Sequence, residues 1–127
     1  MALILLVEDD MLNREMISRY LLLQGFDVIV AVDGVQALAL AQQQLPDLIL
    51  MDMGLPILSG WQATERIKAG PDTSAIPVVA LTAYAMAEDR ERAFAVGCDD
   101  FETKPVNFPQ LKAKIDLLLE RRSKIHE

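Results

Sequence analysis

Short apolar runs alternate with longer amphipathic segments along the whole chain. Five runs place apolar side chains at consecutive positions, which is typical of strands that are covered on both faces of a parallel sheet. These predicted strands cover residues 2–7, 28–32, 48–52, 76–81 and, more weakly, 98–103.

Amphipathic segments fill the intervals between these runs. Their apolar residues recur three or four positions apart, as on one helix face, and capping or stop residues flank them. The predicted helices run from Asn13 to Gly25, from Asp33 to Pro46, over 59–69, over 88–96 before Gly97, and onward from Asn107. The faces expected to be buried carry Met16, Ile17, Tyr20 and Leu21; Val35, Leu38, Ala41 and Leu45; Trp61, Thr64 and Ile67; and Leu111, Ile115, Leu118 and Leu119.

Five strands that alternate with five helices predict a doubly wound α/β sandwich, in which helices cover both faces of a parallel sheet. The 127 residues suit one domain, which buries about two-thirds of the surface of the unfolded chain. In this architecture, sites lie outside the carboxyl ends of the strands, near the point where the strand order reverses. The polar residues that end the strands are therefore the candidates for function.

Composition narrows the classes of function. The net charge of −7 disfavours direct contact with nucleic acid, which needs clustered cations. No apolar run approaches the roughly 20 residues of a membrane span, and the first residues lack the basic start of a signal peptide, so we expect a cytoplasmic protein with no membrane contact. Cys98 is expected to be a core residue without a chemical role, and His126 to belong to a frayed tail.

Acidic residues gather at the predicted rim of the sheet. Glu8, Asp9 and Asp10 follow the first strand, and Asp52 ends the third. Carboxylates in one crevice repel one another unless a cation lies between them, and Mg²⁺ prefers one or two carboxylates with water and phosphate oxygens. We expect Asp9 and Asp52 to be direct ligands, Glu8 to act through water or as an outer partner, and a backbone carbonyl near Gly54 to complete the site.

Two further strands end in residues that suit a phosphoryl group. Thr82 lies 30 residues after Asp52 and Lys104 lies 52 residues after it, each at the end of a different strand. With a cation bound, the Asp52 carboxylate can attack phosphorus in line. Lys104 would offset charge on the equatorial oxygens, and the Thr82 hydroxyl would donate a hydrogen bond to one of them. The expected product is an aspartyl phosphate.

Over residues 1–127 the chain resembles the receiver domain of response regulators in two-component and phosphorelay signalling. The motifs that carry the resemblance are Leu6-Val7-Glu8-Asp9-Asp10, Met51-Asp52-Met53-Gly54-Leu55-Pro56 through Gly60, Leu81-Thr82-Ala83 and Lys104-Pro105. The resemblance implies one flavodoxin-like domain with strand order 2-1-3-4-5 and five helices. It also implies phosphoryl transfer from a phosphohistidine to Asp52, Mg²⁺ bound with help from the Gly54 carbonyl, and a cis peptide before Pro105.

The resemblance further implies roles in switching and in phosphoryl lifetime. Thr82 and Phe101 match the family's switch, in which the hydroxyl moves toward the phosphoryl group and the aromatic ring turns inward. Because Phe101 has no hydroxyl, it cannot signal through a hydrogen bond of its ring. Gly54 and Tyr84 lie two residues after Asp52 and Thr82, at positions that tune autodephosphorylation, and the Tyr84 ring is expected to screen attacking water.

The expected function is therefore a signalling switch that catalyses its own phosphoryl uptake and loss, and not an enzyme in the ordinary sense. The expected partners are a histidine kinase or histidine phosphotransfer protein and a further protein target, with at most a weak or phosphorylation-dependent dimer. Met11, Leu12, Met16 and Leu55-Pro56 flank the acidic crevice. Those of them that are not core would suit a helical phosphodonor, and simple packing in the core is the open alternative.

Three alternatives stay open at this point. The chain could be the receiver segment of a hybrid histidine kinase or of a longer regulator. A Mg²⁺-dependent phosphohydrolase is disfavoured, because dehalogenase-like hydrolases of this kind place the nucleophile after the first strand in a D-x-D pattern, whereas here the lone Asp52 follows the third strand. A flavodoxin-like cofactor binder is disfavoured too, because Glu8, Asp9 and Asp10 would repel the cofactor phosphate.

Overall fold

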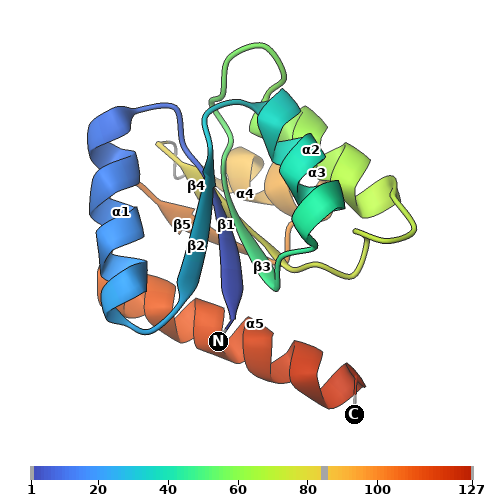
Figure 1. Cartoon of the computed structure of the whole chain (residues 1–127). Helices are drawn as coiled ribbons and strands as arrows, with labels where there is room; N and C mark the ends of the chain where they lie inside the picture. Colours follow the sequence, from blue (N-terminus) through green and yellow to red (C-terminus); the bar gives the residue numbers. More distant parts are fainter. Residues whose placement is uncertain (1, 84–85, 127) are drawn as a thin grey trace.

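Strands and helices alternate strictly along residues 2–83 and 86–126, which are the residues that the structure, a computed structural model, describes (Figure 1). The strands are β1 (Leu3–Val7), β2 (Asp27–Ala31), β3 (Leu48–Asp52), β4 (Val78–Thr82) and β5 (Asp100–Thr103). The helices are α1 (Met11–Leu23), α2 (Gly34–Gln44), α3 (Gly60–Ala69), α4 (Ala87–Ala95) and α5 (Phe108–His126). The bounds of β3 match the predicted ones, and those of the other strands differ by one or two residues, as is usual at the ends of elements.

The five strands form one parallel sheet in the order β2-β1-β3-β4-β5, which confirms the predicted fold class and strand order. Val7 lies opposite both Ala31 and Met51, and Thr82 lies opposite Thr103, so the strands end near the same edge of the sheet. The order reverses between β1 and β3. That reversal leaves a crevice at the carboxyl ends of these two strands, because the connections that follow them lead to opposite faces.

Each face of the sheet has its own apolar layer. Alternate residues of β1 separate into the two layers: Leu5 and Val7 pack with α2 and α3, whereas Ile4 and Leu6 pack with α1 and α5. Figure 1 shows α1 and α5 on one side of the sheet and α2 and α3 on the other. Burial on both faces explains why the strands read as continuous apolar runs and not as alternating ones.

The start of α1 differs from the prediction. Asp10, and not Asn13, is the N-cap: its Oδ2 accepts a hydrogen bond of 2.9 Å from the Asn13 amide, and the helix begins at Met11. The carboxylate satisfies an amide that the first turn of a helix leaves without a partner. Asp10 is thus engaged in capping, which leaves Glu8 and Asp9 as the acidic pair beside the crevice.

The buried face of α2 also differs from the prediction. Gly34, Ala37 and Ala41 are buried, whereas Val35 and Leu45 are 54% and 49% exposed. A side chain on Gly34 would collide with the backbone carbonyl that precedes α3, so the first turn of α2 lies directly against that loop. Close approach of two elements selects small residues, and a ranking of positions by hydrophobicity alone cannot anticipate this.

Within the described residues, none of the helices combines the length and the apolar character needed to cross a membrane. The cytoplasmic location stays a prediction.

Candidate functional site

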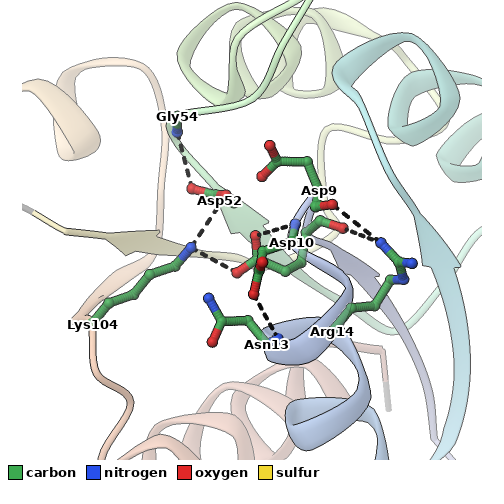
Figure 2. A network of polar contacts seen from close by, with 8 residues as sticks. Asp9, Asp10, Asn13, Arg14, Asp52, Gly54 and Lys104 are labelled. Carbon is green, nitrogen blue, oxygen red and sulfur yellow. Dashed lines mark hydrogen bonds and ion pairs between the residues drawn. The ribbon is translucent and has the colours of Figure 1, made fainter.

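Asp52 ends β3 at the carboxyl edge of the sheet, with 6% of its surface exposed. The four residues before it are fully buried in the two apolar layers, which fixes the position of the strand end. Its Oδ1 accepts a hydrogen bond of 3.0 Å from the Gly54 amide, as Figure 2 shows. A deeply placed carboxylate with one oxygen oriented by the backbone is held in a fixed direction, as a nucleophile requires.

Lys104 connects the two carboxylates that β1 and β3 deliver (Figure 2). Its Nζ lies 2.6 Å from Glu8 Oε1 and 3.2 Å from Asp52 Oδ2. The Lys104 amide donates a hydrogen bond of 2.7 Å to the Thr82 carbonyl, so the backbone after β5 is anchored to the end of β4. The Lys104–Pro105 peptide is cis, as the resemblance implied. Three strand ends are therefore joined around one ammonium group.

The protonation of these groups reflects burial and their mutual contacts. Burial, together with hydrogen bonding to Asp52, raises the pKa of Glu8 to about 7, while Lys104 opposes the rise. Burial also acts to raise the pKa of Asp52, but hydrogen bonds with Glu8 and the Gly54 amide and the charge of Lys104 outweigh it, so the pKa is lowered. Asp52 is consequently the more acidic member of the buried pair.

The acidic pair and Asp52 form a group that fits a divalent cation. One carboxylate oxygen each of Glu8, Asp9 and Asp52 lies within 4.8 Å of the others. Arg14 donates hydrogen bonds to the backbone carbonyls of Glu8 and Asp9, at 3.1 and 3.4 Å, so it braces the acidic pair without neutralising either carboxylate (Figure 2). Oxygen ligands with an excess of negative charge are the donor set that Mg²⁺ prefers.

A cavity of about 420 Å³ opens onto Asp52. Its lining includes the predicted site residues Asp52, Gly54, Thr82 and Lys104, which the tertiary structure thus brings together from β3, β4 and the segment after β5. The other lining residues, Met53, Ala83, Trp61, Asp89 and Arg92, were not among the predicted site residues, and the last three bring side chains from α3 and α4. Trp61 was expected to be core and the other two lie on a polar helix, so only their position beside the cavity distinguishes them.

The remaining predicted residues have mixed outcomes. Phe101 is buried and lies with the α2 and α3 layer, that is, with its ring turned inward. Tyr84 lies outside the described residues. Cys98 is buried in the same layer, as expected, and burial raises the pKa of its thiol to about 11.

The surface predicted to meet a phosphodonor is only partly as expected. Met11, Leu12 and Met16 on α1 are exposed, and so is Pro56, but Leu55 is buried in the core. Leu55 is therefore one of the core residues that the prediction set aside, because side chains in a short loop can turn toward the core even where their neighbours face solvent. The placement of Met16 on the buried face of its helix was wrong, because that face runs through Ile17 and Leu21. Leu12 and Met16 also line a groove of about 390 Å³ that continues to Tyr20 and Phe108, whose rings stack with their centroids 4.6 Å apart.

The carboxyl edge of this doubly wound parallel sheet gathers an acidic pair, a buried aspartate, a threonine and a lysine, so the chain is an α/β domain with an acidic site at the edge of its sheet. Comparison with known families identifies it more closely. Residues 4–116 match the model of the response regulator receiver domain. The chain therefore belongs to the response regulator receiver domain family, whose members function in phosphorelay signalling.

Curated relatives agree with this assignment. The chain is 38% identical over 125 residues to the DNA-binding dual master transcriptional regulator RpaA of Synechocystis sp., covering 98% of this chain but only 52% of RpaA. It is also 38% identical over 107 residues to the polar-differentiation response regulator DivK of Brucella anthropi, covering 84% of this chain and 87% of DivK. The chain thus spans about half of one relative and most of the other.

Solved structures share the whole architecture. The receiver domain of the sensor histidine kinase PA1611 of Pseudomonas aeruginosa, solved with magnesium in its active-site cleft, has a TM-score of 0.88 and 37% identity, covering 94% of this chain and 98% of that one. The receiver domain of Ssk1 of Saccharomyces cerevisiae, solved with the histidine phosphotransfer protein Ypd1, has a TM-score of 0.84 and 31% identity, covering 90% and 86%.

Proposed function

We propose that this receiver domain, over residues 1–127, accepts a phosphoryl group on Asp52 from a phosphohistidine and passes the signal on through protein contacts. The observation that carries the proposal is the bridge from Lys104 to Glu8 and Asp52, at 2.6 and 3.2 Å. It supports a nucleophile with a lowered pKa beside a fixed cation that can offset charge on the transferred group.

Mg²⁺ is the proposed cofactor. Asp9, Asp52 and the Gly54 carbonyl would hold it, with Glu8 as an outer partner. When bound, the ion would supply positive charge against the oxygens of the entering phosphoryl group. The chain's own part is to hold the Asp52 carboxylate in line through the Gly54 amide, to bind phosphoryl oxygens with Lys104 Nζ and the Thr82 hydroxyl, and to limit water by burial.

The proposed switch depends on Thr82 and Phe101. A phosphoryl group adds about −2 charge and new acceptor oxygens beside Thr82, so the arrangement in which its hydroxyl reaches them gains population. The inward position of Phe101 would be coupled to that movement. Tyr84 is proposed to screen the aspartyl phosphate from water. Tyr84→Ala should therefore shorten its half-life, and an equal or longer half-life would exclude this role.

The proposed donor is a histidine kinase or a histidine phosphotransfer protein, docked through an exposed helix face. Met11, Leu12 and Met16 are exposed on α1 beside the crevice, and the Ypd1–Ssk1 complex is a precedent for a receiver domain bound to a phosphotransfer protein. The same switch would serve a free-standing regulator such as DivK or a receiver segment within a longer protein. The chain covers only 52% of RpaA, and the PA1611 structure is the receiver domain of a sensor histidine kinase. A receiver segment within a longer protein is therefore an equal alternative to a free-standing regulator.

Intact-mass spectrometry tests the proposal. The protein is incubated with acetyl phosphate or with a phosphorylated histidine phosphotransfer protein, with and without Mg²⁺. We expect one phosphoryl group on the wild type with the metal and none on Asp52→Asn. Asp72→Asn, the same change at an exposed aspartate outside the cavity, is the matched control and should behave as the wild type. Uptake by Asp52→Asn, or equal uptake without the metal, would contradict the assignment.

Thermodynamic linkage gives a second readout for the metal. Free Mg²⁺ at 100 times its dissociation constant should raise the free energy of unfolding by about 2.7 kcal/mol. Asp9→Asn removes a proposed ligand at an exposed position, so it should keep the fold and lose this stabilisation. An equal Mg²⁺ effect in Asp9→Asn would exclude Asp9 as a ligand.

A further inference from the structure

A stacked pair of side chains closes the outer part of the Asp52 cavity. The Arg92 guanidinium carbon lies 4.3 Å from the centroid of the Trp61 ring. Trp61 comes from α3, which follows the Asp52 loop, and Arg92 from α4, which follows the Thr82 segment; both line the cavity. Arg92 is exposed whereas Asp52 is buried, so the pair lies toward the solvent end of the cavity.

Stacking uses the face of the guanidinium and leaves its edge available. A guanidinium carries five N–H donors in its plane, and a ring below that plane occupies none of them. Within the described residues, no hydrogen bond or ion pair engages the Arg92 guanidinium, although Asp89 lines the same cavity one turn earlier on α4. Trp61 therefore holds a cation in place with its anion-binding edge unused.

Lys104, the second cation of the cavity lining, is already engaged in ion pairs. Lys104 is already bound to Glu8 and Asp52, so its charge is largely matched by theirs before any phosphoryl donor arrives. An anionic donor that enters must approach Asp52 and Asp89, and both repel it. Apart from the proposed Mg²⁺, Arg92 is therefore the cation of the cavity lining whose charge is available to the donor before it reaches Lys104.

We propose that Arg92, held on Trp61, is a positioning residue that recognises the phosphate of a small anionic acyl phosphate as it enters the cavity. The inference rests on the proposed function of Asp52. In the reaction, an Asp52 oxygen attacks phosphorus, the bond from phosphorus to the acyl oxygen breaks, and the carboxylate leaves with the electron pair. Arg92 donates hydrogen bonds to the donor and exchanges no proton.

A residue that acts on the encounter has a distinct kinetic signature. It lowers the donor concentration that gives half of the limiting rate, and it leaves the limiting rate nearly unchanged, because the chemistry takes place at Asp52 and Lys104. Attraction between exposed charges is also screened by salt. A merely structural role for Arg92 would instead lower the limiting rate or the yield of folded protein.

The test measures the initial rate of Asp52 phosphorylation by intact mass over a range of acetyl phosphate concentrations, at saturating Mg²⁺. Arg92→Gln should raise the half-saturating concentration about three- to tenfold, the size expected of one partly solvated charge, and leave the limiting rate within about twofold. Arg92→Lys keeps the charge but loses the stacked plane and its edge of N–H donors, so its half-saturating concentration should lie between those of the wild type and Arg92→Gln. Arg66→Gln removes the same charge from an exposed site on α3 outside the cavity and is the matched control.

Further measurements test the charge dependence of the effect and the role of Trp61. The defect of Arg92→Gln should shrink at high salt, and it should be smaller with phosphoramidate, which carries less negative charge than acetyl phosphate at neutral pH. Trp61→Ala should reproduce the defect because it releases Arg92, whereas Trp61→Phe should not. Unchanged Mg²⁺ binding establishes that each variant keeps the site folded.

The outcomes separate this inference from the proposed function. If Arg92→Gln matches Arg66→Gln, or lowers only the limiting rate, the role of Arg92 is overturned while Asp52 stays the acceptor. If the wild type takes up no phosphoryl group, or Asp52→Asn still does, the proposed function itself fails.

Discussion

A single added methyl group can test how tightly the loop between β3 and α3 packs against the end of β3. Gly60, the first residue of α3, donates a hydrogen bond of 3.2 Å from its amide to the Met53 carbonyl, which closes the loop that carries Gly54. A Cβ at Gly60 would collide with the Asp52 carbonyl oxygen, and it would lie 2.6 Å from Met53 Cα and 2.9 Å from the Asp52 carbonyl carbon. All three atoms belong to the backbone and cannot rotate away.

The size of the effect follows from these distances. Carbon atoms in contact prefer a separation of roughly 3.5 Å, so α3 and the end of β3 must move apart by about 1 Å. Overpacking of this kind costs about 1–3 kcal/mol. Alanine is favoured over glycine in a helix interior by about 1 kcal/mol, but this gain is smaller at the first helical position. Gly60→Ala should therefore lower the free energy of unfolding by about 2 kcal/mol and weaken Mg²⁺ binding, because Asp52 and Gly54 are displaced together.

Gly54→Ala is the matched control. The same methyl group there would meet only Asp52 Oδ1, at 3.7 Å, which is an ordinary contact. We expect a change of less than about 0.5 kcal/mol. Urea unfolding followed by circular dichroism measures both variants, and the fluorescence of Trp61, the chain's only tryptophan, reports Mg²⁺ binding from inside the cavity lining. Equal stability and Mg²⁺ affinity of the two variants would refute the argument that the backbone atoms around Gly60 are fixed.

Three further predictions concern stability and reactivity. The Lys114 Nζ lies 2.7 Å from the buried Glu102 carboxylate, and Lys114→Met leaves that carboxylate without its cation. The free energy of unfolding, measured in urea, should fall by about 3–5 kcal/mol. Lys112→Met, which removes an exposed ion pair on the same helix, should cost less than about 0.5 kcal/mol, and equal losses would contradict the burial argument. Ile57 is 84% exposed and has a φ of 68°, a left-handed conformation that asparagine adopts at a lower cost than isoleucine. Ile57→Asn should therefore raise the free energy of unfolding by about 1 kcal/mol, and a lower free energy of unfolding would show that the left-handed backbone is not strained. Because burial raises the pKa of Cys98 from 9.0 to about 11, the unfolded chain releases the thiol proton first as the pH rises. The thiol's contribution to stability should thus be full below pH 9 and be lost toward pH 11, and native Cys98 should resist iodoacetamide at pH 8 until urea is added; rapid native alkylation would contradict this.

The sequence predicted the fold well because local signals and the global architecture agree. Continuous apolar runs mark strands with both faces covered, and their alternation with helices leaves a parallel sheet as the solution. That the candidate site residues lie close together was predictable for the same reason. Parallel strands end at one edge, so residues that follow different strands, such as Asp9, Asp52 and Lys104, are brought close together by the topology alone.

The wrong predictions of the α1 N-cap and of the buried face of α2 lie where tertiary packing decides between residues that the local sequence cannot distinguish. Both Asp10 and Asn13 are good N-caps, and only the path of the chain out of β1 decides between them. Similarly, Val35 is more hydrophobic than Ala37, but the close approach of α2 to its neighbours buries the smaller side chain.

The amino-acid sequence by itself determined the order of elements, the face-covered sheet and the set of polar residues at its carboxyl edge, since each depends on patterns within a few consecutive residues. Only the tertiary structure decided that Arg14 braces the acidic pair, that Leu55 turns into the core, and that Trp61 and Arg92 meet over the Asp52 cavity. These contacts join residues on different elements or depend on how a loop packs against the core. Their geometry is set by how helices and loops settle against the sheet, and no local pattern records it.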